Sequence, residues 1–206
     1  MSDVQIKRAS NNAERQDTYR TQLGRYSRAM KEGFYFEALL ITYSLLEDRL
    51  KAFLYYCGFF DNRNTLKVSK KCKNDIGVLV LDKNQARWPS FRYISTKIDS
   101  IEKLLCWVES IMQKDIEGNL YYSCLKHSLE SVDTDALLKA LIELRSWIKY
   151  RNEVMHASMN KNIDSLYSEL SERVAEGMDL ARFIDSQVRI IKKYGTVRKT
   201  MKMQNN

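Results

Sequence analysis

The sequence predicts an all-α fold, a single bundle of four to five long helices with a short irregular basic insertion. Its 206 residues include only seven glycines and one proline, too few for the many turns of a β-sandwich or barrel. The apolar share of 44% can build a core, and the 29% of charged residues is mixed among apolar ones rather than set apart, which argues against disorder. Long segments also carry apolar residues three and four positions apart, the spacing of an amphipathic helix.

Each predicted helix follows from a local pattern. Helices are expected over residues 12–31, 34–57, 91–113, 120–129, 134–157 and 163–194. The seam of the second consists of Leu39, Tyr43, Leu46, Leu50, Phe53 and Cys57. The seam of the third consists of Ile94, Ile98, Ile101, Leu105, Val108 and Met112. The last helix carries Gly177 on its seam, which predicts a bend or a close contact with another helix.

The remaining segments complete one domain, which suits the chain length. Residues 61–90 form the irregular insertion, with a brief strand expected at 77–81. The organisation is then a polar, basic helix or arm over 1–30, the bundle over 31–195 and a flexible basic tail over 196–206.

The net charge of +8 favours a polyanionic partner, because neutralising phosphates releases condensed counterions. Part of the surplus is clustered in the insertion, at Lys67, Lys70, Lys71 and Lys73. We expect this cluster to bind the polyanion. The basic run from Arg189 to Lys202 is expected to be a solvated helix end and a frayed tail.

The cysteines, the first residues and the lengths of the apolar runs predict a cytoplasmic protein, and no metal or cofactor is expected. Cys57 and Cys106 are expected in the core, as small apolar residues. Cys124 and His127 form half of a zinc-like spacing with no second half nearby. No apolar run approaches the roughly 20 residues that span a bilayer, and the first residues lack the apolar stretch of a secretory signal.

One charged residue interrupts the seam of helix 134–157. That seam reads Leu137, Leu141, Leu144, Ile148, Arg151 and Met155. A buried guanidinium group needs a carboxylate or phosphate partner. Asn152 and His156 are four residues apart and therefore share one face beside Arg151, and Glu153 could orient the imidazole ring of His156.

These residue types suit the cleavage of RNA. Histidine transfers protons near neutral pH, and a fixed arginine stabilises the charge of a pentavalent phosphorane. The 2′-hydroxyl of RNA supplies the nucleophile, so no metal is required. A purely structural alternative is that Arg151 forms an ion pair with Glu47 in a neighbouring helix, while His156 interacts with the helix C-terminus.

The segment from Trp147 to His156 resembles the signature of the HEPN (higher eukaryotes and prokaryotes nucleotide-binding) superfamily, an Arg followed by a polar residue and, after four to six intervening positions, a His. The helix 34–50 resembles an earlier helix of that family, which often carries an acidic residue facing the motif. The resemblance covers roughly residues 30–195. It implies a HEPN-like helical bundle, usually a homodimer in which the two motifs meet, and many members are metal-independent endoribonucleases.

Carried over to this chain, the resemblance implies that Arg151 stabilises the scissile phosphate, that His156 is the general acid or base, and that Asn152 positions one of them. Glu47 would orient Arg151 or His156, with Asp48 as its competitor. The expected partners are RNA, a second copy of the chain, and an antitoxin or defence-system protein. Some HEPN toxins carry, two residues after the His, a Tyr that an antitoxin modifies; here that position is Ser158. A non-catalytic HEPN module that binds nucleotide or RNA is the alternative.

Overall fold

The structure is a computed structural model that describes residues 12–81, 88–111, 116–157 and 163–203. Its helices are α1 (Asn12–Lys31), α2 (Tyr35–Tyr56), α3 (Lys73–Val80), α4 (Ile94–Ser110), α6 (Leu120–Leu129), α7 (Thr134–Ala157), α8 (Ile163–Tyr194) and α9 (Val197–Thr200). No strand occurs in the described ranges, where an isolated bridge joins Phe60 and Val68. The predicted all-α class is confirmed. Met112 of the third seam and Ser158 lie outside the described residues.

The strand predicted at 77–81 is wrong, because most of this apolar run belongs to α3. A short apolar run does not distinguish a buried strand from a buried helix. Here Ile76, Leu79 and Val80 are buried, three and four residues apart, which places them on one face of a helix. The first turn carries Asp75, where a negative charge complements the helix dipole.

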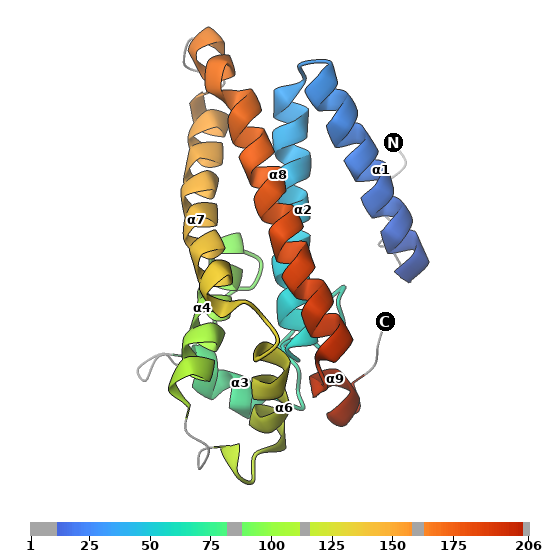
Figure 1. Cartoon of the computed structure of the whole chain (residues 1–206), viewed down its shortest axis with the longest axis vertical. Helices are drawn as coiled ribbons and strands as arrows, with labels where there is room; N and C mark the ends of the chain where they lie inside the picture. The colour runs from blue at the N-terminus through green and yellow to red at the C-terminus, as the bar shows by residue number, and fades with distance from the viewer. Residues whose placement is uncertain (1–11, 82–87, 112–115, 158–162, 204–206) are drawn as a thin grey trace, which may run out of the picture.

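Helix α2 occupies the centre of the molecule (Figure 1). It packs against α8, α1 and α4, and α7 in turn packs against α8 and α4. The C-terminus of α7 and the N-terminus of α8 lie at one end of the long helices, and α3, α6 and α9 lie at the other (Figure 1). This arrangement places the C-terminal end of α7 beside the N-terminal half of α2.

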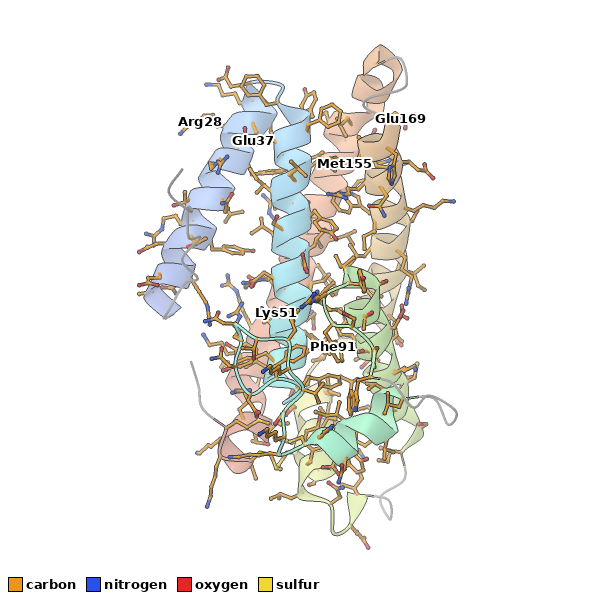
Figure 2. The ribbon with its side chains drawn as sticks, turned by 180° about the vertical axis from the view of Figure 1, so that it is seen from behind. Arg28, Glu37, Lys51, Phe91, Met155 and Glu169 are labelled. Atoms are coloured by element: carbon orange, nitrogen blue, oxygen red, sulfur yellow. The ribbon has the colours of Figure 1, made fainter. Side chains whose placement is uncertain are left out.

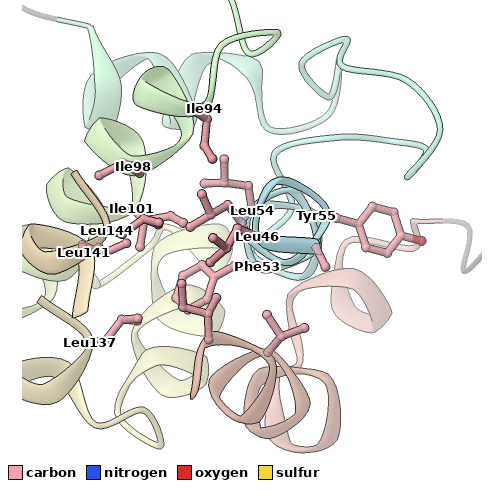
Figure 3. Packing of buried hydrophobic residues seen from close by; sticks show 14 of the residues in the cluster. Leu46, Phe53, Leu54, Tyr55, Ile94, Ile98, Ile101, Leu137, Leu141 and Leu144 are labelled. Atoms are coloured by element: carbon pink, nitrogen blue, oxygen red, sulfur yellow. The ribbon is translucent and has the colours of Figure 1, made fainter. Parts of the chain in front are cut away.

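The core lies where α2, α4, α7 and α8 meet (Figure 3). Its members include Leu46, Phe53, Ile98, Ile101, Leu137, Leu141 and Leu144, all essentially inaccessible to solvent. Cys57 is buried as predicted, whereas the prediction that Cys106 belongs to the core is wrong, since its side chain is exposed. Leu104 and Leu105 take the inward positions of this turn of α4, so the next residue points outward.

The close contact predicted at Gly177 is confirmed. A Cβ atom at this position would overlap the indole ring of Trp147 on α7. The indole Nε1 donates a hydrogen bond to the carbonyl of Arg173 at 2.6 Å. The absence of a side chain at Gly177 therefore lets α7 and α8 approach closely, about one helical turn before Arg151.

The segment 196–203 does not match the flexible tail that the sequence predicts. Val197, Arg198 and Met203 are buried, and the guanidinium group of Arg198 donates hydrogen bonds to the carbonyls of Phe60 at 2.9 Å and Asp61 at 3.1 Å. Charged residues are rarely buried unless they are paired or hydrogen-bonded. Here, backbone carbonyls near the end of α2 satisfy the charge and hold the segment to the bundle.

Candidate active site

The candidate site is built around Arg151, near the C-terminal end of α7. Its side chain is half-buried, and its guanidinium carbon lies 4.4 Å from the centroid of the Tyr43 ring on α2. A guanidinium group over an aromatic face is stabilised by the ring quadrupole. Arg151 is thus held by a ring rather than by a carboxylate.

Arg151 keeps hydrogen-bonding capacity for a ligand. Its Nη1 donates to the amide oxygen of Asn152 at 3.1 Å, and its buried Nε has no hydrogen-bond acceptor within the described structure. A buried donor without an acceptor costs stability, and such groups are concentrated at functional sites. The guanidinium group as a whole is only half-buried, and its charge, which no carboxylate neutralises in the described structure, suits a phosphate oxygen.

Asn152 and His156 lie on the exposed side of the same helix end. His156 makes no hydrogen bond or ion pair with any residue that the structure describes. Glu153 lines a separate groove between α7 and α8 and does not hydrogen-bond to His156. The imidazole of His156 is therefore accessible to a substrate or to a second copy of the chain.

Glu47 is not bonded to the motif, contrary to the role predicted for it. Its carboxylate pairs with the ammonium group of Lys97 on α4 at 2.9 Å, and Lys97 is completely buried. The structural alternative, an ion pair between Arg151 and Glu47, is likewise not what the side chains form. A buried ammonium group strongly requires a carboxylate, so Glu47 pairs with Lys97. Arg151 contacts the ring of Tyr43 instead.

Glu47 still influences the site through Tyr43, which lies one helical turn before it. Burial and the negative charge of Glu47 raise the pKa of the Tyr43 phenol, and the positive charge of Arg151 opposes them. The phenol therefore remains neutral at physiological pH. Asp48, the competing carboxylate, faces the other way and binds Arg49 and Arg63.

The predicted RNA-binding lysines are not brought to the motif. They are Lys67, Lys70, Lys71 and Lys73, in the loop before α3 and at its start. This region lies at the end of the molecule opposite the C-terminus of α7 (Figure 1). All four side chains are exposed. Lys71 donates to the carbonyls of Met201 at 3.1 Å and Lys202 at 2.6 Å, so it ties the C-terminal segment to the loop.

Tyr43 belongs to the apolar seam of helix 34–57, and its contact with Arg151 was not predicted from the sequence. The signal available was its place four residues before Glu47, on the helix expected to face the motif. Lys97 was also missed, because nothing in the sequence distinguishes a buried lysine from the exposed ones around it.

The groove between α7 and α8 is a weaker candidate. It has a volume of about 800 Å³ and is lined by both signs of charge, with Lys139, Lys149 and Arg173 set against Glu143, Glu153, Glu176 and Asp179. Such a balanced lining offers no preference for an anion. The described residues hold no cluster of three or more His, Cys, Asp or Glu side chains suited to a metal ion.

Comparison with known proteins found no matching protein-family model, no matching curated protein and no matching solved structure. In the ranges that the structure describes, no helix has the length and apolar character needed to cross a membrane.

Proposed function

We propose that this chain is a metal-independent endoribonuclease of the HEPN type, which cleaves RNA in a dimeric cleft formed by Arg151 and His156 and serves as a toxin or in anti-phage defence. The observation that carries the proposal is the state of Arg151. It is half-buried beside Tyr43, and its Nε donor is left without an acceptor. Asn152 and His156 are exposed next to it, as a phosphate-binding and proton-transfer site requires.

In the proposed reaction, one imidazole accepts the proton of an RNA 2′-hydroxyl while its oxygen attacks the adjacent phosphorus. The bond from phosphorus to the 5′-oxygen breaks, and a second imidazole donates a proton to that leaving oxygen. The products are a 2′,3′-cyclic phosphate and a 5′-hydroxyl. Arg151 stabilises the charge on the non-bridging oxygens in the transition state.

The two proton transfers explain why a dimer is proposed. One histidine cannot readily act as base and acid in a single displacement, and the only other histidine, His127, is on α6, at the opposite end of the molecule from the C-terminus of α7 (Figure 1). A twofold axis near the C-terminal end of α7 would supply a second His156 and a second Arg151.

The second candidate is a non-catalytic HEPN module that binds RNA or nucleotide. It is favoured by the lack of a hydrogen-bonding partner for His156 among the described residues. Catalytic histidines usually have one ring nitrogen held by a neighbouring acceptor, and here Glu153 does not provide it.

Cleavage of a labelled RNA in the presence of EDTA tests the proposal. The variants His156→Ala and Arg151→Ala should each lose at least about a hundredfold in rate, and the wild-type products should carry 2′,3′-cyclic phosphates. Matched controls are His127→Ala, at the only other histidine, and Arg145→Ala, at an arginine of α7 that pairs with Asp99 and Glu102. Both controls should cleave as the wild type does.

Two outcomes would decide against the enzyme. Equal activity in the His156→Ala variant and in the wild type would exclude His156 from the reaction. RNA binding without turnover by the wild-type dimer would favour the binding module.

A further inference from the structure

A second basic site lies on the other side of α2 from Arg151. Helices α1 and α2 and the loop after α2 enclose a cleft of about 690 Å³, lined among others by Arg15, Tyr19, Asp48, Lys51 and Asn64. Its volume is in the range of ligand-binding clefts. Lys51 lies in this region of the molecule, close to the loop (Figure 2).

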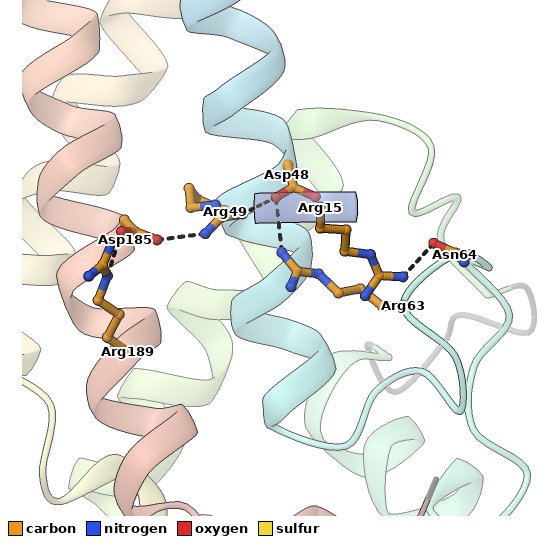
Figure 4. Close-up of polar contacts among 7 residues, drawn as sticks. All are labelled: Arg15, Asp48, Arg49, Arg63, Asn64, Asp185 and Arg189. Carbon is orange, nitrogen blue, oxygen red and sulfur yellow. Dashed lines mark hydrogen bonds and ion pairs between the residues drawn. The ribbon is translucent and has the colours of Figure 1, made fainter. Parts of the chain in front are cut away.

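Guanidinium groups outnumber carboxylates in the polar network that joins the cleft to α8 (Figure 4), in which Arg15, Asp48 and Arg49 line the cleft itself. Asp48 binds Arg49 and also Arg63, the latter at 3.0 Å. The guanidinium group of Arg49 also pairs with the carboxylate of Asp185, at 2.6 Å. The same carboxylate pairs with Arg189 at 2.8 Å. Two carboxylates therefore serve three guanidinium groups. The other carboxylate that lines the cleft, Glu37, pairs with Arg25 at 2.7 Å.

Lys51 adds a fourth cation and no carboxylate. Its half-buried ammonium group makes no hydrogen bond or ion pair with the residues that the structure describes. Burial lowers the pKa of Lys51, and the positive charges of Lys97, Arg63 and Arg15 lower it further, against the opposing effect of Asp48. Both effects disfavour the charged lysine, and an anion bound beside it would offset them.

Two donors of the cluster also lack acceptors. The Nε atoms of Arg49 and Arg63 are buried and have no hydrogen-bond partner in the described structure. On the facing helix, Arg15 reaches across to the neutral amide oxygen of Asn64 at 2.7 Å. The lining of the cleft thus carries a surplus of positive charge, with Arg15, Arg25, Arg49 and Lys51 set against Glu37 and Asp48, and such a surplus favours phosphate oxygens.

We propose that the cleft between α1 and α2 binds backbone phosphates of the RNA as a second contact site, a role that rests on the proposed function. A polynucleotide fits better than a mononucleotide, because the cleft offers charge rather than a base pocket. The aromatic residue among its lining side chains is Tyr19, and the guanidinium group of Arg49 covers one face of that ring at 4.7 Å.

The position of the cleft relative to Arg151 suits one continuous strand. Helix α2 lies between α1 and α7 when the molecule is seen from behind (Figure 2). Ser44 of α2 lines the cleft, and the ring of the preceding residue, Tyr43, contacts the guanidinium group of Arg151. An RNA strand that crosses α2 would pass from the cleft to the motif.

Binding of an RNA oligonucleotide with 2′-O-methyl groups throughout tests the site, because this RNA lacks the nucleophile and cannot be cleaved. The double variant Arg15→Gln, Lys51→Gln should bind at least about tenfold more weakly at low salt. The slope of log K against log salt should become shallower by about 0.7 for each phosphate that the variant no longer neutralises. The matched control is Arg20→Gln, Lys139→Gln, which removes the same charge at two exposed positions outside the cleft.

The outcomes separate this site from the proposed function. If the wild type cleaves RNA and the cleft variant binds with the affinity and salt slope of the control, the second site is wrong and the enzyme stands. If the wild type cleaves nothing and the cleft variant alone binds weakly, the site stands and the proposed function fails.

Two further measurements test for misfolding of the variants and for binding of free nucleotides. Single variants Lys51→Gln and Arg15→Gln, each checked by circular dichroism, exclude loss of binding through misfolding. Competition by a mononucleotide as effective, per phosphate, as an oligonucleotide would show that the cleft takes free nucleotides, and would overturn its assignment to the RNA backbone.

Discussion

The guanidinium group of Arg151 lies over the aromatic ring of Tyr43, with its central carbon 4.4 Å from the ring centroid. The contact joins the end of α7 to α2 without a carboxylate. A carboxylate partner would neutralise the arginine and occupy its donors, whereas a ring face leaves both the charge and the donors for a ligand. This relationship is what makes Arg151 suitable for a phosphate.

Removing the ring should impair the proposed cleavage. The Tyr43→Ala variant should lose about 0.5–2 kcal/mol of stabilisation of the guanidinium group, equivalent to a fall in kcat/KM of about 2- to 30-fold. The Tyr43→Phe variant keeps the ring face and should cleave at close to the wild-type rate. Steady-state kinetics on one RNA substrate measure both, and equal losses in the two variants would point to the hydroxyl instead of the ring.

The contact between Gly177 and Trp147 should be intolerant of a single methyl group. The Gly177→Ala variant forces the indole ring to move and should lower the free energy of unfolding by about 1–3 kcal/mol, with a fall in Tm of about 2–4 °C for each kcal/mol. Gly24 is the control, because it lies within helix α1 and a Cβ atom there would meet nothing within 4 Å. Gly24→Ala should raise stability by about 0.5–1 kcal/mol.

A double-mutant cycle checks that the ring is responsible. In a Trp147→Phe background, the smaller ring leaves room near Gly177, so Gly177→Ala should cost less than in the wild type. The same cost in both backgrounds would show that the strain lies elsewhere.

Arg198 should hold the C-terminal segment to the bundle. The Arg198→Met variant keeps most of the side-chain length but removes the hydrogen bonds to the carbonyls of Phe60 and Asp61. We expect a loss of about 2–4 kcal/mol in denaturant unfolding, since charge-assisted hydrogen bonds contribute about 1.5–3 kcal/mol each. The adjacent exposed Lys199 provides the control, and Lys199→Met should stay within about 0.5 kcal/mol of the wild type. Matching stabilities of the two variants would contradict the anchoring role.

The four cysteines should differ sharply in their reaction with a thiol reagent. Cys106 is exposed, whereas Cys57, Cys72 and Cys124 are buried. Burial and the nearby carboxylates of Asp75 and Asp61 raise the pKa of Cys72 to about 11, and burial raises the pKa of Cys57 further, so neither provides thiolate at neutral pH.

We therefore expect one thiol per chain to react rapidly with dithionitrobenzoate in the folded protein, and four after unfolding in guanidinium chloride. The Cys106→Ser variant should show no rapid reaction when folded. Rapid modification of a second thiol in the folded wild type would contradict the burial of the other three.

Periodicity along the chain was enough to predict the long helices and the position of the motif. Helical periodicity is a local property, because residues three and four apart share a face whatever lies beyond the helix. The seam of residues 34–57 therefore predicted α2 almost to the residue, and the same rule revealed Arg151 in an apolar seam and anticipated close packing at Gly177.

Which side chains meet across helices became clear from the packing of the helices alone. Glu47 pairs with Lys97, fifty residues away in sequence, and Arg151 takes Tyr43 instead. The predicted lysine cluster lies at the opposite end of the molecule, and Arg198 of the expected tail is buried. These outcomes depend on the register and crossing of packed helices, and on the cost of burying each charge without a partner. Neither quantity can be obtained from the spacing of residues along one helix.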